Sequence, residues 1–156
     1  MQFSLTDEQT MIQDTARRFA ETELSPVAAI LEDANERPTY LKNLKKLADI
    51  GFMGLNISSD YGGSEAGVIP FSLALTEIGR ACASTAVAMS VNNLVGEVVQ
   101  SIGTEDQKKI YIPKLCNGEF ACASFCLTES GAGSDPSRLK TLATKDGAEG
   151  VLNGSK

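Results

Sequence analysis

Residues 122–135 read Cys-Ala-Ser-Phe-Cys-Leu-Thr-Glu-Ser-Gly-Ala-Gly-Ser-Asp, and the structure is expected to change character within this stretch. In its first half, Ala123, Phe125 and Leu127 alternate with small or polar residues, a pattern that predicts a buried strand. The second half is too rich in glycine and hydroxyl side chains for a helix or a strand. It predicts a loop that follows the strand directly.

This loop, residues 128–135, has the composition of a binding site made by main chain. Gly131 and Gly133 permit positive φ and let the backbone approach another molecule closely. Thr128, Ser134 and Asp135 place hydroxyls and a carboxylate around exposed amides. We interpret the loop as a site for an oxygen-rich ligand. A bare Gly-x-Gly leaves an ordinary turn as the alternative.

Composition excludes several classes of function. The 156 residues are 42% apolar, which is enough for a core, and the net charge of −6 argues against nucleic acid as a partner. No apolar run reaches the roughly 18 residues that span a bilayer, and the amino terminus has no basic-then-apolar leader. We therefore expect a cytoplasmic protein, or a matured protein of the mitochondrial matrix.

Histidine is absent, and cysteine occurs four times, at positions 82, 116, 122 and 126. Without histidine or a Cys-x-x-Cys pair we expect no metal site, and the cysteines are interpreted as buried free thiols. The commonest general base and the Ser-His and Cys-His nucleophile systems are also excluded. Any chemistry must rest on carboxylates, a cofactor or residues outside this chain.

The residues before the loop predict a series of amphipathic helices. Thr6-Asp-Glu-Gln9 and Thr104-Glu-Asp-Gln107 are capping boxes that begin two of them. Pro38 begins another helix, and Gly51 ends it. After the loop, residues 139–144 and 150–153 predict two strands joined by a turn.

The most apolar helix is predicted between residues 83 and 103. Its apolar residues form one wide stripe that we expect to be buried at the centre of a bundle: Val87, Val91, Leu94, Val95, Val98 and Ile102. Asn92 and Asn93 lie in the same helix. We expect their amides to be paired within the core, with a ligand-facing role as the alternative.

The string Leu127-Thr-Glu-Ser-Gly-Ala-Gly-Ser-Asp135 closely resembles the flavin-contacting signature of the acyl-CoA dehydrogenase family, with Ser130 where that family usually has proline. Gly51-Phe-Met-Gly-Leu55 followed by Tyr61-Gly-Gly63 is similar to the segment after the family's third helix. Gly103–Gln107 and Tyr111–Leu115 resemble the residues just upstream of its flavin signature. The resemblance covers essentially the whole chain.

This resemblance implies a mainly α fold, an up-and-down helical bundle over residues 1–119, followed by the first strands of a β-barrel-like domain over residues 120–156. It also implies that a second, carboxy-terminal helical domain is missing from this chain. The implied activity is α,β-dehydrogenation of acyl-CoA thioesters with FAD, and the implied partners are an electron-transfer flavoprotein and further copies of the chain in a dimer or tetramer.

Carried over by position, the resemblance implies that FAD is contacted by Phe125, Cys126, Leu127, Thr128, Glu129, Gly131, Ala132, Gly133 and Ser134. Ser134 is also expected near the acyl-CoA. No catalytic residue is expected here, because the family's proton-abstracting carboxylate comes from its carboxy-terminal domain. Glu129 is a poor candidate for that base, and Asp135 is expected to brace the loop.

Two alternatives to this function remain open. Acyl-CoA oxidases and flavin monooxygenases share the implied architecture and differ in the reaction. The second alternative is a truncated, non-catalytic helical module for binding or assembly. What would distinguish these functions lies outside the sequence motifs.

Overall fold

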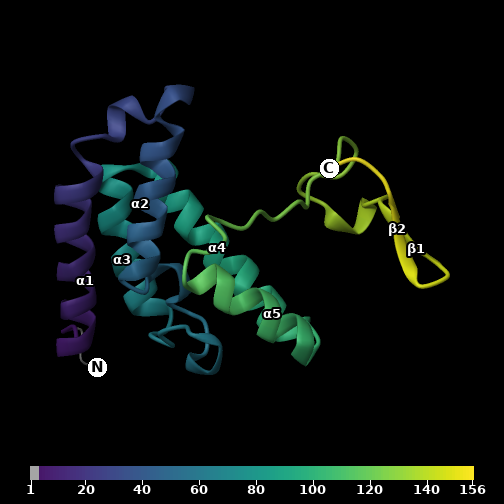
Figure 1. The fold of residues 1–156 in the computed structure, drawn as a ribbon, viewed down its shortest axis with the longest axis horizontal. Coiled ribbons are helices and arrows are strands. Elements are labelled where there is room, and N and C mark those ends of the chain that lie inside the picture. Colours follow the sequence, from purple (N-terminus) through teal and green to yellow (C-terminus); the bar gives the residue numbers. More distant parts are fainter. Residues whose placement is uncertain (1–3) are drawn as a thin grey trace. The chain divides into compact units, whose positions relative to one another are not determined.

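The structure is a computed structural model that describes residues 4–156. The chain forms two compact units, a helical unit that ends at Ser124 and a smaller unit from Phe125 to Lys156. Figure 1 traces both along the chain. The predicted domain boundary after residue 119 stays a prediction.

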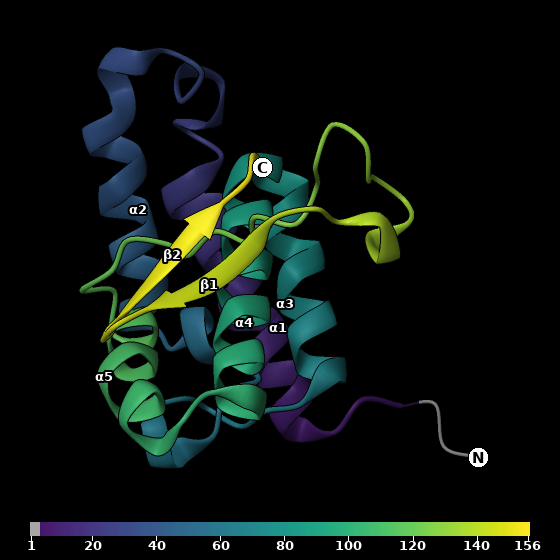
Figure 2. The ribbon, with the colours of Figure 1, turned by 90° about the vertical axis from the view of Figure 1, so that its right-hand side faces the viewer.

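Five α-helices build the first unit: α1 (Asp7–Phe19), α2 (Arg37–Asp49), α3 (Val68–Ala81), α4 (Ala83–Ile102) and α5 (Glu105–Cys116). α1 continues into a π-helical turn at Ala20–Leu24, and short 3₁₀ turns connect the other helices. α3 packs against α1 and α4, and α4 packs against α5. Figure 2 shows α1, α3 and α4 side by side. The predicted fold class is confirmed.

Local signals in the sequence mark the helix ends. Both capping boxes are present, with Thr6 Oγ1 accepting from the Gln9 amide at 3.2 Å and Thr104 Oγ1 accepting from the Gln107 amide at 3.3 Å. Gly51 follows α2 at φ +82°, in the left-handed region that ends a helix. α5 runs through Pro113, which lies inside the helix. Proline has no amide hydrogen, so α5 lacks the bond that residue 113 would otherwise donate to the Lys109 carbonyl.

The core lies between α1, α3, α4 and the 3₁₀ turn at Phe52–Gly54. Phe52, Met53 and Leu55 anchor that connection and are 3% exposed or less, as the apolar residues of this loop predicted. The core also includes Ala16, Phe19, Leu24, Leu47, Ile78 and Met89. These residues hold the helices around α4.

α4 buries the opposite side from the one predicted. Val87, Leu94 and Ile102 of the expected core stripe are 62%, 43% and 81% exposed. The buried residues of α4 are small or polar: Thr85, Ala86, Ala88, Met89, Asn92, Asn93 and Gly96. The missing side chain at Gly96 makes room for the Ile57 side chain, since a Cβ on Gly96 would lie 2.6 Å from Ile57 Cδ1. The two asparagines are paired within the protein, as expected.

In the second unit, β1 (Leu142–Asp146) and β2 (Glu149–Asn153) form an antiparallel hairpin in which Ala143 faces Leu152. This hairpin matches the predicted pair of strands. The strand predicted from Ala123 to Leu127 is wrong, since residues 122–128 have no regular structure. A strand needs a neighbour to accept its hydrogen bonds, and β1 and β2 pair only with each other.

The four cysteines are free, as expected. Cys82 and Cys116 are buried, whereas Cys122 is half-buried and Cys126 is exposed, so the prediction of burial holds for only two of them. Cys126 is exposed because it belongs to the segment that forms no strand.

A buried carboxylate joins α1 to α3. The Glu77 side chain is 5% exposed and accepts from Arg17 Nη2 and Arg80 Nη1, each at 3.0 Å, and from Gln13 Nε2 at 3.2 Å. The guanidinium of Arg17, in α1, thus turns to a carboxylate of α3. Hydrogen bonding from Arg17 lowers the pKa of Glu77, against the desolvation that would raise it.

We predict that Glu77→Gln lowers the free energy of unfolding by about 1.5–3 kcal/mol at pH 7, because hydrogen bonds to a charged acceptor become neutral ones. The folded-state pKa is lowered, so the contribution of Glu77 is present above the unfolded pKa and is lost as the pH falls through the folded pKa. Chemical denaturation from pH 7 to pH 3 should therefore show the difference from wild type shrinking. Glu32→Gln, at an exposed position, is the control, and a gap that stays constant with pH would contradict the prediction.

Candidate functional site

The loop from Phe125 to Asp135 lies in the second unit and contains one tight turn. Glu129 and Ala132 exchange two main-chain hydrogen bonds, of 3.1 and 3.0 Å, and Ser130 and Gly131 stand between them. Ala132 is buried, at 3% exposure. Neither Gly131 nor Gly133 has positive φ, so the expectation that these glycines serve a positive φ is wrong.

The Glu129 side chain holds this loop to the residues on either side of the β-hairpin. Its carboxylate accepts from the Lys140 amide at 2.7 Å and the Thr141 amide at 3.0 Å. Lys156 Nζ lies 2.9 Å from the same carboxylate and also donates to the Leu127 carbonyl at 2.9 Å. The Glu129 side chain is only 9% exposed. The loop is therefore tied to the segments on both sides of the hairpin.

The environment of Glu129 lowers the pKa of its carboxyl group. Hydrogen bonding from Thr141, then from the Lys140 amide and the Lys156 ammonium, lowers its pKa to about 2. A carboxylate with this pKa stays ionised at neutral pH and has little affinity for a proton. This agrees with its expected unsuitability as the base.

Asp135 braces the end of the loop, as expected. Its Oδ1 accepts from the Ser137 amide at 3.2 Å and from the Ser137 hydroxyl at 2.6 Å. These bonds begin the 3₁₀ turn at Pro136–Arg138. The carboxylate is thus used within the loop itself.

The remaining predicted site residues face outward. Phe125 and Leu127 are 48% and 36% exposed, and the hydroxyls of Thr128 and Ser134 make no hydrogen bond within residues 4–156. A Cβ added to Gly131 or Gly133 would meet no atom within 4 Å. Of the nine predicted site residues, Glu129 and Ala132 turn inward, and the other seven are exposed. The loop thus combines unpaired hydroxyls, open main chain and apolar surface.

Sequence reasoning missed Lys156, Lys140 and Thr141, which hold Glu129. Their contribution is a main-chain amide or a distant ammonium, and neither leaves a spacing pattern that could be recognised.

The described residues contain no group of three or more cysteine, aspartate and glutamate side chains that could hold a metal ion. Within residues 4–156 no helix has the length and apolar character to cross a membrane.

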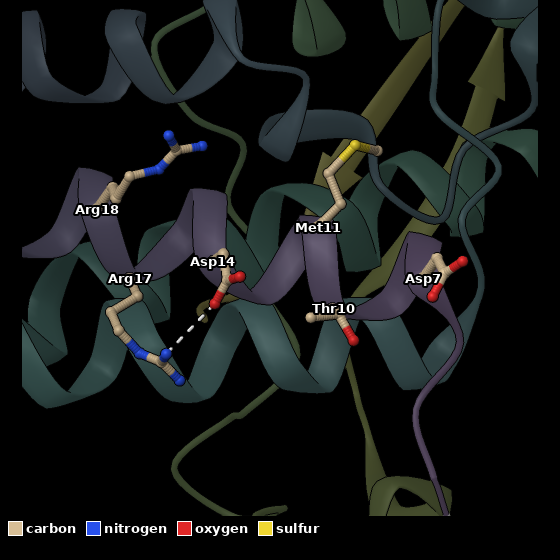
Figure 3. A pocket seen from close by; sticks show the side chains of 6 residues that line it. All are labelled: Asp7, Thr10, Met11, Asp14, Arg17 and Arg18. Atoms are coloured by element: carbon tan, nitrogen blue, oxygen red, sulfur yellow. Dashed lines mark hydrogen bonds and ion pairs between the residues drawn. The ribbon is translucent and has the colours of Figure 1, made fainter.

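A surface hollow of about 540 Å³ lies along α1, away from this loop in the sequence. Asp7, Thr10, Met11, Asp14, Arg17 and Arg18 line it. Figure 3 shows that all six project from one helix and that Arg17 pairs with Asp14, at 3.3 Å. Its acidic and basic groups are mixed, and no second element closes it. This hollow has none of the features of a reaction site.

Comparison with known proteins identifies relatives of the chain. Residues 6–119 match the family model for the acyl-CoA dehydrogenase N-terminal domain. The chain is 40% identical to acryloyl-CoA reductase (NADH) of Anaerotignum propionicum and 36% identical to the short-chain specific acyl-CoA dehydrogenase of Clostridium acetobutylicum. Each alignment covers 100% of this chain, and 39% and 41% of those proteins.

A solved structure shows the same fold. The acyl-CoA dehydrogenase of Bacillus anthracis complexed with FAD is 30% identical, with a TM-score of 0.85. The match covers 97% of this chain and 26% of that one. The chain therefore spans about two fifths or less of the length of these proteins.

We predict that the Glu129 carboxyl group titrates with a pKa of about 2, because Thr141, Lys140 and Lys156 all stabilise its charged form. Carbon-detected NMR of the side-chain carboxyl from pH 6 to pH 1.5 measures this value. The folded pKa is lowered, so the anchoring of the loop is present above the unfolded pKa and is lost as the pH falls toward 2. A midpoint near the ordinary value of about 4.3 would contradict the anchoring role.

Proposed function

The chain belongs to the acyl-CoA dehydrogenase family, and we propose that it is the amino-terminal part of a flavoprotein that oxidises acyl-CoA thioesters to trans-2-enoyl-CoA. One observation of the structure carries this proposal: a loop locked from behind by Glu129 presents two unpaired hydroxyls and two open glycines. Such a surface fits a flat, polar-edged ring, which can lie directly against main chain.

The cofactor proposed for this loop is FAD. When bound, FAD supplies the acceptor for the hydride that leaves the β-carbon of the thioester. Phe125 and Leu127 would offer apolar surface to the ring, and the Thr128 hydroxyl with neighbouring amides would face its polar edge. Gly131 and Gly133 would keep the backbone close, because neither position has a side chain to hold the ring away.

A loop held in place by Glu129 is suited to stabilise the negative charge that develops on a flavin when it accepts a hydride. Donors that are already in place stabilise developing negative charge without reorganising. The Glu129 charge does not oppose this, because its carboxylate turns inward and pairs with Lys156. Of the loop's side chains, only Glu129 and Asp135 are acidic, and both are held by their own hydrogen bonds. The residue that removes the α-proton is therefore proposed to lie outside residues 1–156.

Substrate would meet this chain at two places. Ser134, exposed and unpaired within residues 4–156, is proposed to lie near both the flavin and the acyl-CoA. The exposed apolar side of α4, which includes Val87 and Leu94, is proposed to line part of the acyl pocket. The electron acceptor is proposed to be an electron-transfer flavoprotein, and the assembly a dimer or tetramer.

The full-length protein tests this function directly. It should purify with flavin absorbance that bleaches when an acyl-CoA is added without oxygen, across a panel from butyryl-CoA to palmitoyl-CoA. Residues 1–156 alone should not bleach flavin, since the residue that removes the α-proton is proposed to lie outside them. Fast reoxidation by oxygen would indicate an oxidase or monooxygenase, and absence of flavin from the full-length protein would indicate a binding or assembly module.

The two open glycines permit a sharper test. We predict that Gly133→Ala in the full-length protein weakens FAD binding by roughly tenfold or more, because the added methyl holds the ring about 1 Å or more off the loop and forfeits contacts that need close approach. The free energy of unfolding of the apoprotein should change by less than about 0.5 kcal/mol, since the methyl meets no protein atom and φ is not positive.

Gly150→Ala in β2 is the matched control. Gly150 also has no atom within 4 Å of an added Cβ and belongs to the same unit, but lies outside the loop. Fluorescence titration of the apoprotein with FAD should give wild-type affinity for this variant. Equal affinities for the two alanine variants would contradict the proposed place of the flavin.

A further inference from the structure

Two adjacent asparagines of α4 make equivalent sets of hydrogen bonds with different neighbours. Asn92 is fully buried and Asn93 is 1% exposed. Asn93 Nδ2 donates to the carbonyls of Phe52 and Met89, both at 3.0 Å, and its Oδ1 accepts from the Asn56 amide at 3.3 Å. All of these partners lie in α4 or in the connection after α2. Asn93 therefore stabilises the core locally.

Asn92 joins three separate segments. Its Nδ2 donates to the carbonyl of Met53 at 2.8 Å and to that of Leu115, near the end of α5, at 3.4 Å. Its Oδ1 accepts from the amide of Ala123 at 3.0 Å. The first two bonds hold α4 to the core. The third fixes the chain as it leaves the helical unit.

The bond from the Ala123 amide to Asn92 is the last hydrogen bond donated by the main chain before the loop. In the described chain, no main-chain group from Ser124 to Cys126 makes a hydrogen bond, and the next is the Leu127 carbonyl. Cys122 adds a weaker contact, from its Sγ to the Ala88 carbonyl at 3.3 Å. The bond to Asn92 Oδ1 is therefore the stronger of two contacts that hold the chain just before the loop.

We propose that Asn92 is a positioning residue for the flavin loop, acting through the Ala123 amide to order the residues that lead into Phe125. This rests on the proposed function, since it assumes that the loop holds FAD. A neutral amide is required at this position, because one side chain must both donate to carbonyls and accept from an amide. Freeing Ala123 adds conformational freedom to the residues before Phe125, and binding FAD must then remove it.

The test compares three variants of the full-length protein. Asn92→Ala removes the anchor together with two core bonds, and Asn93→Ala removes an equal number of bonds without touching Ala123. Ala123→Pro removes the amide that Asn92 Oδ1 accepts and keeps the Asn92 side chain for its bonds to Met53 and Leu115. Its ring also restricts the backbone at Cys122 and Ala123, and the melting temperature reports that added cost. This variant keeps the test valid if Asn92→Ala folds poorly. Each variant is measured for FAD affinity, for thermal unfolding of the apoprotein, and for hydrogen exchange of residues 123–134.

Asn92→Ala and Ala123→Pro should each raise the FAD Kd by roughly tenfold, and in Asn92→Ala the Ala123 amide, which loses its acceptor, should exchange faster. Asn93→Ala should lower the melting temperature about as much as Asn92→Ala while its FAD Kd and the exchange of the Ala123 amide stay near wild type. FAD affinities that follow melting temperature across all three variants would overturn the positioning role. A wild-type protein that binds no FAD would instead overturn the proposed function, and the role proposed for Asn92 would fall with it.

Discussion

The pairing of buried amides with main-chain carbonyls is the constraint on which the helical unit depends. Phe52 and Met53 lie in a 3₁₀ turn at the centre of the core, where their carbonyls have no helix or strand to bond to. A buried polar group left without a partner costs about 1–3 kcal/mol. Asn92 and Asn93 supply those partners from α4. The irregular connection can therefore be buried with both carbonyls paired.

This constraint also determines which way α4 faces. Once the asparagines must turn inward, the side with Val87 and Leu94 turns outward, although it is the more apolar. Gly96 and the alanines of the inner side then let Ile57 and the turn come close. The burial of apolar surface given up on one side of the helix is offset by hydrogen bonds and close packing on the other.

The sequence predicted what local interactions decide. Capping boxes, the stop at Gly51 and the hairpin after residue 140 depend on neighbours a few positions away, and they were confirmed. The orientation of α4 and the missing strand at residues 122–127 depend on distant partners, and both predictions were wrong. In the loop, the motif predicted a set of site residues but not the directions in which their side chains point. That Glu129 faces inward follows from amides beyond it in the chain.

The Glu129 carboxylate is held only by donors from residues later in the described chain. Its donors are the amides that lead into β1 and an ammonium that follows β2. During synthesis the helical unit emerges first, and its contacts form among residues already made. The loop can take its final shape only after the whole hairpin has left the ribosome. The proposed cofactor site is thus completed late in synthesis, after the helical unit has emerged.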